Sequence, residues 1–483
     1  MKKLLIFATV MLLMLAFVGC DQKPSDATTP APSGSNDPQA TATPEPEKIF
    51  HNAGENYRIL IWNNKEENDY VLKSADVRAD DIKARWEKYQ ADYGITITYI
   101  KAPGDWIGEA QSSANAGTPV CDILHCGGPF TIPTMYSYGG GAGTILTPLS
   151  DYPDAGNFAD SEYWDVSGQE NVCTFGGKLY YALPRELGYG VVAYNQVTFF
   201  NADITEAAGY TAEELYKLSK EGNWTFDKMR EVAIACTDAD KGVYGMHMGQ
   251  NTCAVFAMVA ANDGRYITNI DGVPTFTANS TNVIDAVNYF VKLAKDDKVV
   301  YLEGAPGSDD DHPTFVTGKH ALMITYANRA PKIYQEENLE YGILMPPKGP
   351  AADDYISDSN WFTPYAVMAN VMNPAGCVQL ISKYIRPEYA MSSPEAQMLF
   401  DSDLTMYVKD DGSKQTLIDV ISKTRTSPIM TYTSVAGSDG KGLGTYMFGE
   451  TNNWIKGEGS PAVHFEAVTG AANDLLKGAL GLK

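Results

Sequence analysis

The spacing of hydrophobic and polar residues predicts alternating strands and helices in the first part of the folded chain. Residues 57–62 and 95–100 are short apolar runs, and each predicts a strand. Between them, four apolar side chains recur at helical spacing: Ile82, Trp86, Tyr89 and Tyr93. A helix over about 106–116 and a buried strand over 122–125 follow. Strands that alternate with helices in this way predict right-handed crossovers and a largely parallel sheet.

The middle and the end of the chain are richer in helical patterns. Thr225 and Ser280 each precede an amphipathic stretch, and both are residue types that cap helix N-termini. Residues 321–326 form a continuous apolar run that predicts a buried strand. Helical patterns recur near the end, at about 443–456 and 462–477. The chain is therefore expected to be of the α/β class.

The N-terminus has the pattern of a secretory signal. Two lysines precede an almost unbroken apolar run over residues 4–18, and Gly19 and Cys20 follow it. This stretch resembles the lipobox of bacterial lipoproteins, although Phe17 stands where that family usually has Leu. The resemblance implies removal of residues 1–19, acylation of Cys20 and anchoring at the extracellular face of the cytoplasmic membrane. An ordinary signal peptide is the alternative.

Composition adds a tether and excludes one class of partner. Residues 20–55 are rich in Pro, Ser, Thr and Ala and have few large apolar side chains, so we expect a lipid-anchored disordered linker. The formal net charge is −23, which argues against binding to nucleic acid or to anionic lipid. Contact with the membrane is then expected through the lipid anchor only.

Length and cysteine content bound the folded part. From about residue 56 onward the chain is longer than one hydrophobic core usually serves, so two lobes are expected. Six cysteines besides Cys20 permit disulfides outside the cell and leave their pairing open, while Cys236 lies in an apolar helical stretch and suits a core thiol. No spacing of Cys and His suggests zinc, and neither a metal nor a cofactor is expected.

Several segments, taken in order, resemble the extracellular solute-binding proteins of family 1, the substrate-capture subunits of ABC importers for sugars. They are GGKLYYALP at 176–184, YN at 194–195, WTFD at 224–227, FVTGKHALM at 315–323 and YGILMPP at 341–347. Each segment alone is a weak signal. Their order and spacing together make the resemblance specific.

The resemblance implies a two-lobe periplasmic-binding-protein-like fold of type II, in which hinge strands join interleaved lobes and a ligand cleft lies between them. Lobe one is expected over 56–190 and 371–424, and lobe two over 197–361 and 433–483. The hinge crossings are expected near 190–196, 362–370 and 424–432. Local periodicity alone does not predict this interleaving.

Ligands of open α/β sheets bind beyond the carboxyl ends of the strands, which selects candidate residues without reference to the family. The selected side chains combine aromatic rings, which stack on sugar C–H faces, with amide and charged groups that bind hydroxyls. The candidates from this rule are Trp62, Asn63, Asn64, His125, Arg185, Glu186, Tyr189, Tyr326, Asn328 and Arg329. Trp361 is added because it lies beside a hinge crossing that the resemblance implies. Several have structural alternatives: His125 as a structural histidine, Arg185 and Glu186 as a mutual pair, and Trp361 as hinge packing.

The sequence therefore predicts a monomeric, lipid-anchored protein that captures a sugar or oligosaccharide, closes on it and presents it to ABC permease subunits. No catalytic residue is assigned, because the chain has no GxSxG, HExxH or phosphate-loop motif. A secreted enzyme acting on polysaccharide is the alternative, since two carboxylates of a glycosidase leave no sequence signature. A further alternative keeps the fold but serves as a sensor or binds another polar solute.

Overall fold

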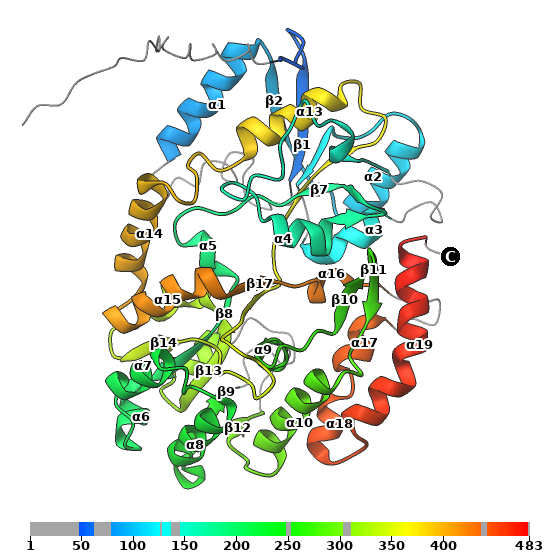
Figure 1. Cartoon of the computed structure of the whole chain (residues 1–483). Coiled ribbons are helices and arrows are strands. Elements are labelled where there is room, and N and C mark those ends of the chain that lie inside the picture. Colours follow the sequence, from blue (N-terminus) through cyan, green and yellow to red (C-terminus); the bar gives the residue numbers. More distant parts are fainter. Residues whose placement is uncertain are drawn as a thin grey trace, which may run out of the picture. The chain divides into compact units, whose positions relative to one another are not determined.

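The computed structural model describes residues 48–61, 79–125, 128–136, 145–247, 253–302, 311–435 and 442–481. Two β-sheets with their surrounding helices form the body of the protein, and we refer to each sheet with its helices as a lobe (Figure 1). The predicted signal peptide, Cys20 and most of the predicted linker lie outside the described residues.

The first lobe contains a six-stranded sheet in the order β2-β1-β3-β16-β4, with β7 paired to β16. The strands are β1 (Asn56–Ile61), β2 (Thr96–Lys101), β3 (Ile123–His125), β4 (Leu146–Thr147), β7 (Tyr181–Ala182) and β16 (Tyr365–Met368). Strand β1 is parallel to β2 and β3, as the alternating pattern predicts, whereas β16 runs antiparallel. Strand β16 comes from far along the sequence, so the lobe is not one continuous segment.

Short elements and helices cover this first sheet. They are α1 (Ala79–Tyr93), α2 (Trp106–Asn115), η1 (Pro129–Thr131), α3 (Ile132–Tyr136), η2 (Leu149–Asp151), α4 (Val166–Gly168), η3 (Gln169–Cys173), β5 (Thr174–Phe175), β6 (Lys178–Leu179), α13 (Pro374–Leu380) and η6 (Ile381–Ile385). The aromatic face predicted for α1 packs on the sheet through Trp86, Tyr89 and Tyr93. Gly94 follows the helix at φ +63°, a conformation that suits glycine and ends the helix.

Residues 48–55 belong to the folded body, so the linker predicted over 20–55 extends too far. The side-chain amide of Gln379 in α13 bonds the backbone of Lys48 at 2.9 Å and that of Phe50 at 2.8 Å. His51 is buried, and its two ring nitrogens lie 2.9 and 2.8 Å from the hydroxyls of Tyr57 and Tyr89. These contacts fix the start of the body against α1 and α13. The sequence did not predict them, because residues 48–55 contain few apolar side chains.

The second lobe contains a five-stranded sheet in the order β12-β9-β13-β8-β14. Its strands are β8 (Gln196–Asn201), β9 (Tyr244–His247), β12 (Val300–Tyr301), β13 (His320–Tyr326) and β14 (Tyr341–Leu344). Strand β13, the buried run expected over 321–326, is parallel to β9 and antiparallel to β8. All seven of its residues are buried, as expected for a central strand.

Helices pack on both faces of this sheet. They are α6 (Ala202–Ala207), α7 (Ala212–Lys220), α8 (Phe226–Cys236), α9 (Cys253–Ala261), α10 (Thr281–Lys295), α11 (Asp311–Phe315) and α12 (Ala330–Ile333), with η4 (Ala239–Lys241), η5 (Ala327–Arg329) and the hairpin β10 (Ile267–Ile270) and β11 (Val273–Phe276). Thr225 caps α8 by accepting from the backbone N–H of Lys228 at 3.3 Å, as predicted. Ser280 stands at the N-cap of α10, but its side chain makes no capping hydrogen bond.

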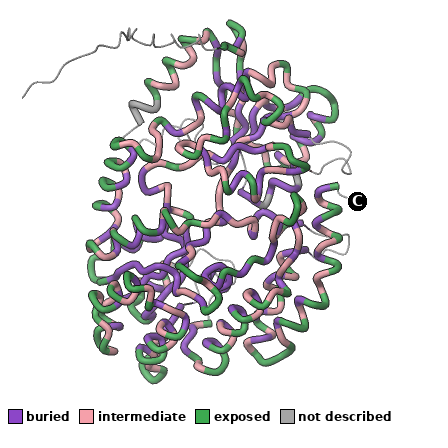
Figure 2. The backbone as a smooth tube through the Cα atoms, in the orientation of Figure 1, coloured by how far each residue is buried: buried purple, intermediate pink, exposed green. Residues whose placement is uncertain are grey.

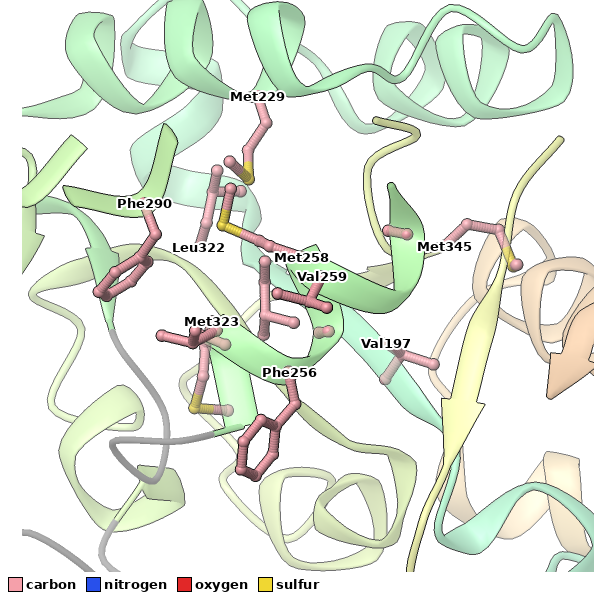
Figure 3. Packing of buried hydrophobic residues seen from close by; sticks show 14 of the residues in the cluster. Val197, Met229, Phe256, Met258, Val259, Phe290, Leu322, Met323 and Met345 are labelled. Carbon is pink, nitrogen blue, oxygen red and sulfur yellow. The ribbon is translucent and has the colours of Figure 1, made fainter. Parts of the chain in front are cut away.

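Helix α9 is the centre of the second core because every one of its nine residues is buried. Figure 3 shows Phe256 and Met258 of α9 among Met229 of α8, Phe290 of α10 and Leu322 of β13. Apolar side chains on all sides leave no solvent-facing stripe, which is the pattern of a helix enclosed by other elements. Figure 2 shows the contrast with outer helices such as α6 and α8, where exposed turns alternate with buried ones.

From residue 394 onward, most of the chain returns to the second core. Its helices are α14 (Pro394–Tyr407), α15 (Asp411–Lys423), α17 (Leu443–Phe448), α18 (Thr451–Lys456) and α19 (Pro461–Ala479). Phe400 of α14 and Leu417 of α15 are buried in the same hydrophobic cluster as the second sheet. The lobe-one segment expected over 371–424 therefore contains two helices that pack in the other core. The boundaries of the lobes otherwise stay a prediction.

Three short elements connect the lobes. Helix α5 (Gly190–Ala193) leads into β8, while β15 (Ser357–Ser359) and β17 (Thr424–Thr426) form a parallel pair outside both main sheets. Helix α16 (Ile429–Tyr432) follows β17, which is labelled near the centre of Figure 1. Asn195 joins these connections, because its side-chain amide donates to Ser357 Oγ at 3.2 Å and to Thr424 Oγ1 at 2.9 Å. The α/β class and the two-lobe arrangement expected from the sequence are confirmed.

Candidate functional site

The carboxyl end of β13 is held against the segment that returns to the first lobe. Tyr326 closes the strand, and its phenol donates to Asn360 Oδ1 at 2.7 Å. The Tyr326 side chain is buried, and burial raises the pKa of its hydroxyl well above the ordinary value. The ring of Tyr194 meets the Tyr326 ring edge-on at 6.3 Å and is itself exposed. Tyr326 thus serves as a hydrogen-bonded anchor, and Tyr194 presents the open aromatic surface.

Two polar side chains follow β13 directly in η5. The side-chain oxygen of Asn328 is buried, and within the described part of the chain it has no hydrogen-bond partner. A buried acceptor without a partner is costly, which makes this atom suited to a ligand hydroxyl. Arg329 next to it is also buried and brings a cation to the same end of the strand. Together they offer an acceptor and a multiple donor, the chemistry that polar hydroxyls require.

His125 occupies the corresponding position at the carboxyl end of β3 in the first lobe. Its ring stacks on Tyr365 with the planes 3° apart and the centroids at 3.7 Å. Burial lowers the pKa of His125 to about 3, and a hydrogen bond to the backbone carbonyl of Pro364 opposes this only in part. The imidazole is therefore neutral at physiological pH. This arrangement favours the structural interpretation of His125.

Residues 360–365 connect these two strand ends. Asn360 at one end is bound to Tyr326 of the second lobe, and Tyr365 at the other stacks on His125 of the first. Trp361 lies between them and is half-buried. The segment therefore forms a strip between the carboxyl ends of β13 and β3, with Trp361 next to its Asn360 end.

The loop before α5 supplies the remaining candidates. The Tyr189 hydroxyl donates to the Ala327 carbonyl at 2.7 Å and its backbone N–H to Asp403 Oδ2 at 2.6 Å, so Tyr189 fixes the loop to η5 and α14. Arg185 donates through Nε to the Ser161 carbonyl at 2.7 Å, and Glu186 is exposed. The interpretation of Tyr189 shifts from ligand contact towards support of the hinge.

The structure thus brings Tyr189, Tyr326, Asn328 and Arg329 together at the carboxyl end of β13, with Trp361 on the adjoining strip. His125 lies at the far end of that strip, and Arg185 and Glu186 lie on the approach to α5. Trp62, Asn63 and Asn64 fall outside the described residues. The ligand contacts assigned to all these residues stay predictions.

Sequence reasoning missed three residues of this region: Tyr194, Asn360 and Tyr365. Tyr194 entered the sequence analysis only as part of a family segment. Its position as an aromatic residue within the crossing predicted near 190–196 could have marked it as a candidate ligand contact. Asn360 directly precedes the candidate Trp361, and its place beside the crossing predicted near 362–370 could have marked it in the same way. The stacking of Tyr365 on His125 joins residues 240 positions apart and has no local signature.

The described residues contain no sign of a metal site, a membrane-spanning helix or a disulfide. No cluster of three or more His, Cys, Asp or Glu side chains is placed to hold a metal ion there. None of the helices in that part of the chain combines the length and apolar character that a membrane crossing requires. The cysteines it contains are buried and free of disulfides, including the predicted core thiol: Cys121, Cys173, Cys236, Cys253 and Cys377.

Comparisons with known proteins identify the family. The sequence profile of the family described as bacterial extracellular solute-binding protein matches residues 75–391. No curated protein matches the chain. Many solved structures share the two-lobe periplasmic-binding-protein-like fold.

Three of these structures match this chain over nearly all of their own length. The cyclic alpha-maltosyl-1,6-maltose binding protein of Arthrobacter globiformis superposes with a TM-score of 0.61 at 14% identity, covering 88% of this chain and 100% of that one. The galacto-N-biose-/lacto-N-biose I-binding protein of Bifidobacterium longum, in complex with lacto-N-biose, gives 0.58 at 15% identity, with 89% and 98% covered. The GacH receptor of Streptomyces glaucescens, described unliganded and with acarbose, gives 0.56 at 16% identity, with 88% and 99% covered.

Proposed function

The chain belongs to the bacterial extracellular solute-binding protein family, and from this premise we propose that it captures a sugar or short oligosaccharide between its two lobes. The observation that carries the proposal is the strip at 360–365, where the ligand-facing strand ends of both lobes meet. Structural neighbours named as binders of maltose-type and galacto-N-biose-type sugars support the ligand class.

The chemistry of the site fits a polyol better than an ion or a peptide. Asn328 offers an unpaired acceptor and Arg329 a buried donor, while the exposed Tyr194 and half-buried Trp361 offer flat apolar surfaces. A pyranose has hydroxyls around its rim and C–H groups on its faces, so it satisfies both kinds of group at once. We propose that the ligand contacts from the first lobe come from the candidates selected in the sequence, which are Trp62, Asn63, Asn64, His125, Arg185 and Glu186.

Capture requires no reaction. A ligand that contacts both lobes stabilises the closed arrangement by the difference between its affinities for the closed and open forms. We propose that residues 48–189 and 365–385 form lobe one. The long segment 196–359 and the helices after 393 then form lobe two. The connections at 190–196, 360–364 and 386–393, together with β17, then carry the rotation.

Delivery is the second part of the proposal. Acylation of Cys20 would hold the protein at the extracellular face of the membrane, and the polar stretch over 21–47 would act as its tether. The closed, loaded form would then be recognised by the permease subunits of an ABC importer. The protein would act as a monomer, with neither cofactor nor catalytic residue.

A thermal-shift screen of residues 48–483 against mono- and oligosaccharides tests the ligand class. A sugar present at 100 times its Kd stabilises the folded form by about 2.7 kcal/mol and raises the melting temperature. Asn328→Ala is expected to weaken the best sugar about tenfold, because one buried hydrogen bond is lost. Asn223→Ala changes an exposed asparagine between α7 and α8 and serves as the matched control. Binding of peptides or polyamines, with silence across all sugars, would reject the proposal.

A further inference from the structure

Two consecutive side chains of β17 hold opposite lobes. The guanidinium of Arg425 donates to Asp263 Oδ1 at 3.1 Å and to the Gly264 carbonyl at 2.9 Å, both just after α9 of the second lobe. The Thr426 hydroxyl donates to Asp165 Oδ2 at 2.6 Å, and Asp165 caps α4 of the first lobe. Successive side chains of a strand point to opposite faces. Strand β17 therefore links the lobes through its side chains as well as its backbone.

The partner of Arg425 across the strand pair is a buried carboxylate. Asp358 of β15 stands in register with Arg425 and is 2% exposed. Its Oδ2 accepts from Asn360 Nδ2 at 2.9 Å and from Ser427 Oγ at 2.8 Å. Asp358 is thus joined through Asn360 to the strip beside the proposed ligand site, and through Arg425 to β17 and to the loop after α9.

The ion pair itself is incompletely made. Arg425 Nε lies 3.7 Å from Asp358 Oδ1, beyond the 2.7–3.2 Å range of N–H···O hydrogen bonds. Both atoms are buried, and neither has a hydrogen-bond partner among the described residues. Buried charged groups left short of a hydrogen bond are costly, so a small rotation that closes this gap is favoured.

The space beside the pair has the same character. A pocket with a cavity volume of about 30 Å³ is lined by both residues and by Tyr266 and Asn269. The Tyr266 hydroxyl and the Asn269 side-chain oxygen are also buried without partners. This volume is sufficient for bound water. Four buried polar atoms without protein partners around one small cavity mark a contact that either a bound water or a small shift of β17 would complete.

We propose that Arg425 and Asp358 are positioning residues for ligand capture: their pairing sets the balance between lobe arrangements without touching the ligand. The effect on affinity rests on the proposed function, whereas the effect on lobe arrangement does not. A shift in the balance between arrangements multiplies the Kd of every ligand by the same factor. A residue that contacts ligand instead changes different ligands unequally.

Asp358→Asn is the informative variant because its amide oxygen keeps the shape and the two Oδ2 contacts while the charge is lost. Asp297→Asn is the matched control, since it removes the carboxylate of the Arg230–Asp297 pair, whose two hydrogen bonds of 2.6 and 2.7 Å lie within the second lobe. If Asp358→Asn does not fold, Arg425→Lys replaces it in the same measurements. This variant keeps the positive charge but loses the two guanidinium hydrogen bonds to Asp263 and Gly264.

The first readout needs no ligand. Spin labels on cysteines introduced at Lys88 of α1 and Glu213 of α7, both exposed, report the distance between the lobes by double electron–electron resonance. We expect the distance distribution to move in Asp358→Asn and to stay unchanged in Asp297→Asn. An unchanged distribution in Asp358→Asn, or an equal change in both variants, would overturn the proposal.

The second readout uses maltotetraose and lacto-N-biose in calorimetric titrations. For each probe that binds, Asp358→Asn should change Kd about tenfold, by one common factor, whereas Asp297→Asn should leave Kd unaltered. Unequal factors for the two probes would show direct contact and contradict the assignment. If neither sugar binds, the sugar proposal fails for these probes, and the spin-label distances alone decide the role of the pair.

Discussion

Lowering the pH from 7 to 5 should destabilise this protein by several kcal/mol, because burial lowers the pKa of three histidines in the folded state. His125 and His247 are each 7% exposed, and His320 is 3% exposed. Burial lowers the pKa of His247 and of His320 to about 4, and that of His125 to about 3. In the unfolded chain a histidine titrates near the reference value of about 6.5.

The sign and size follow from proton linkage. Between these folded-state pKa values and about 6.5, the unfolded chain binds protons that the folded chain does not, so stability is complete above that window and falls as the pH falls. At pH 5 nearly three more protons are bound by the unfolded chain, which gives a slope of about 4 kcal/mol per pH unit. Integrated from pH 7, each histidine contributes about 2 kcal/mol and the three together about 6 kcal/mol. That loss is comparable with the whole stability of many domains.

Urea unfolding followed by circular dichroism at pH 7 and pH 5 measures this loss. Most depressed carboxylates titrate below this window, so the histidines dominate the difference. His320→Gln removes one titrating group and should reduce the loss by about 2 kcal/mol, whatever it does to stability at pH 7. A free energy of unfolding at pH 5 within 1 kcal/mol of the value at pH 7 (a margin of about half of one histidine's contribution) would refute the reasoning.

Three further predictions concern single sites. Gly245→Ala should destabilise the second lobe by about 1–3 kcal/mol in urea unfolding, because its Cβ would clash with the Ala233 carbonyl oxygen of α8; wild-type stability would contradict the close packing. Burial alone would raise the pKa of Glu55, but hydrogen bonds from Asn52, Tyr57 and Asn373 lower it to about 2. The stabilisation that Glu55 contributes is present above pH 4.5 and is lost as the pH falls towards 2, so Glu55→Gln should reduce the dependence of the melting temperature on pH over that range. The five described cysteines are buried, so they should react with a thiol reagent only after unfolding, and rapid labelling of any of them in the native protein would show otherwise.

Local patterns were sufficient where one face of an element decides its structure. The aromatic spacing of Trp86, Tyr89 and Tyr93 predicted α1, and the apolar run at 321–326 predicted β13, because each side chain packs on its own sheet. The order of the family segments supplied the two lobes. Neither source could assign α14 and α15, whose apolar faces are compatible with either core until the chain path between the lobes is known.

The connections between the lobes were beyond sequence reasoning for a related cause. Asp358 and Arg425 are partners only because β15 and β17 pair in parallel across 66 intervening residues. The stacking of His125 on Tyr365 and the bond from Tyr326 to Asn360 likewise depend on tertiary arrangement. The strand-end rule found Tyr326, Asn328 and Arg329, because position along a strand is a local property.

Small-angle X-ray scattering of residues 48–483, with and without the best sugar from the thermal screen, tests the central claim most directly. If the two lobes close on a bound carbohydrate, the radius of gyration should decrease on saturation, and the Asn328→Ala variant should need more sugar for the same decrease. A sugar that binds tightly while the scattering curve stays unchanged, or the lack of any sugar that binds, would contradict it.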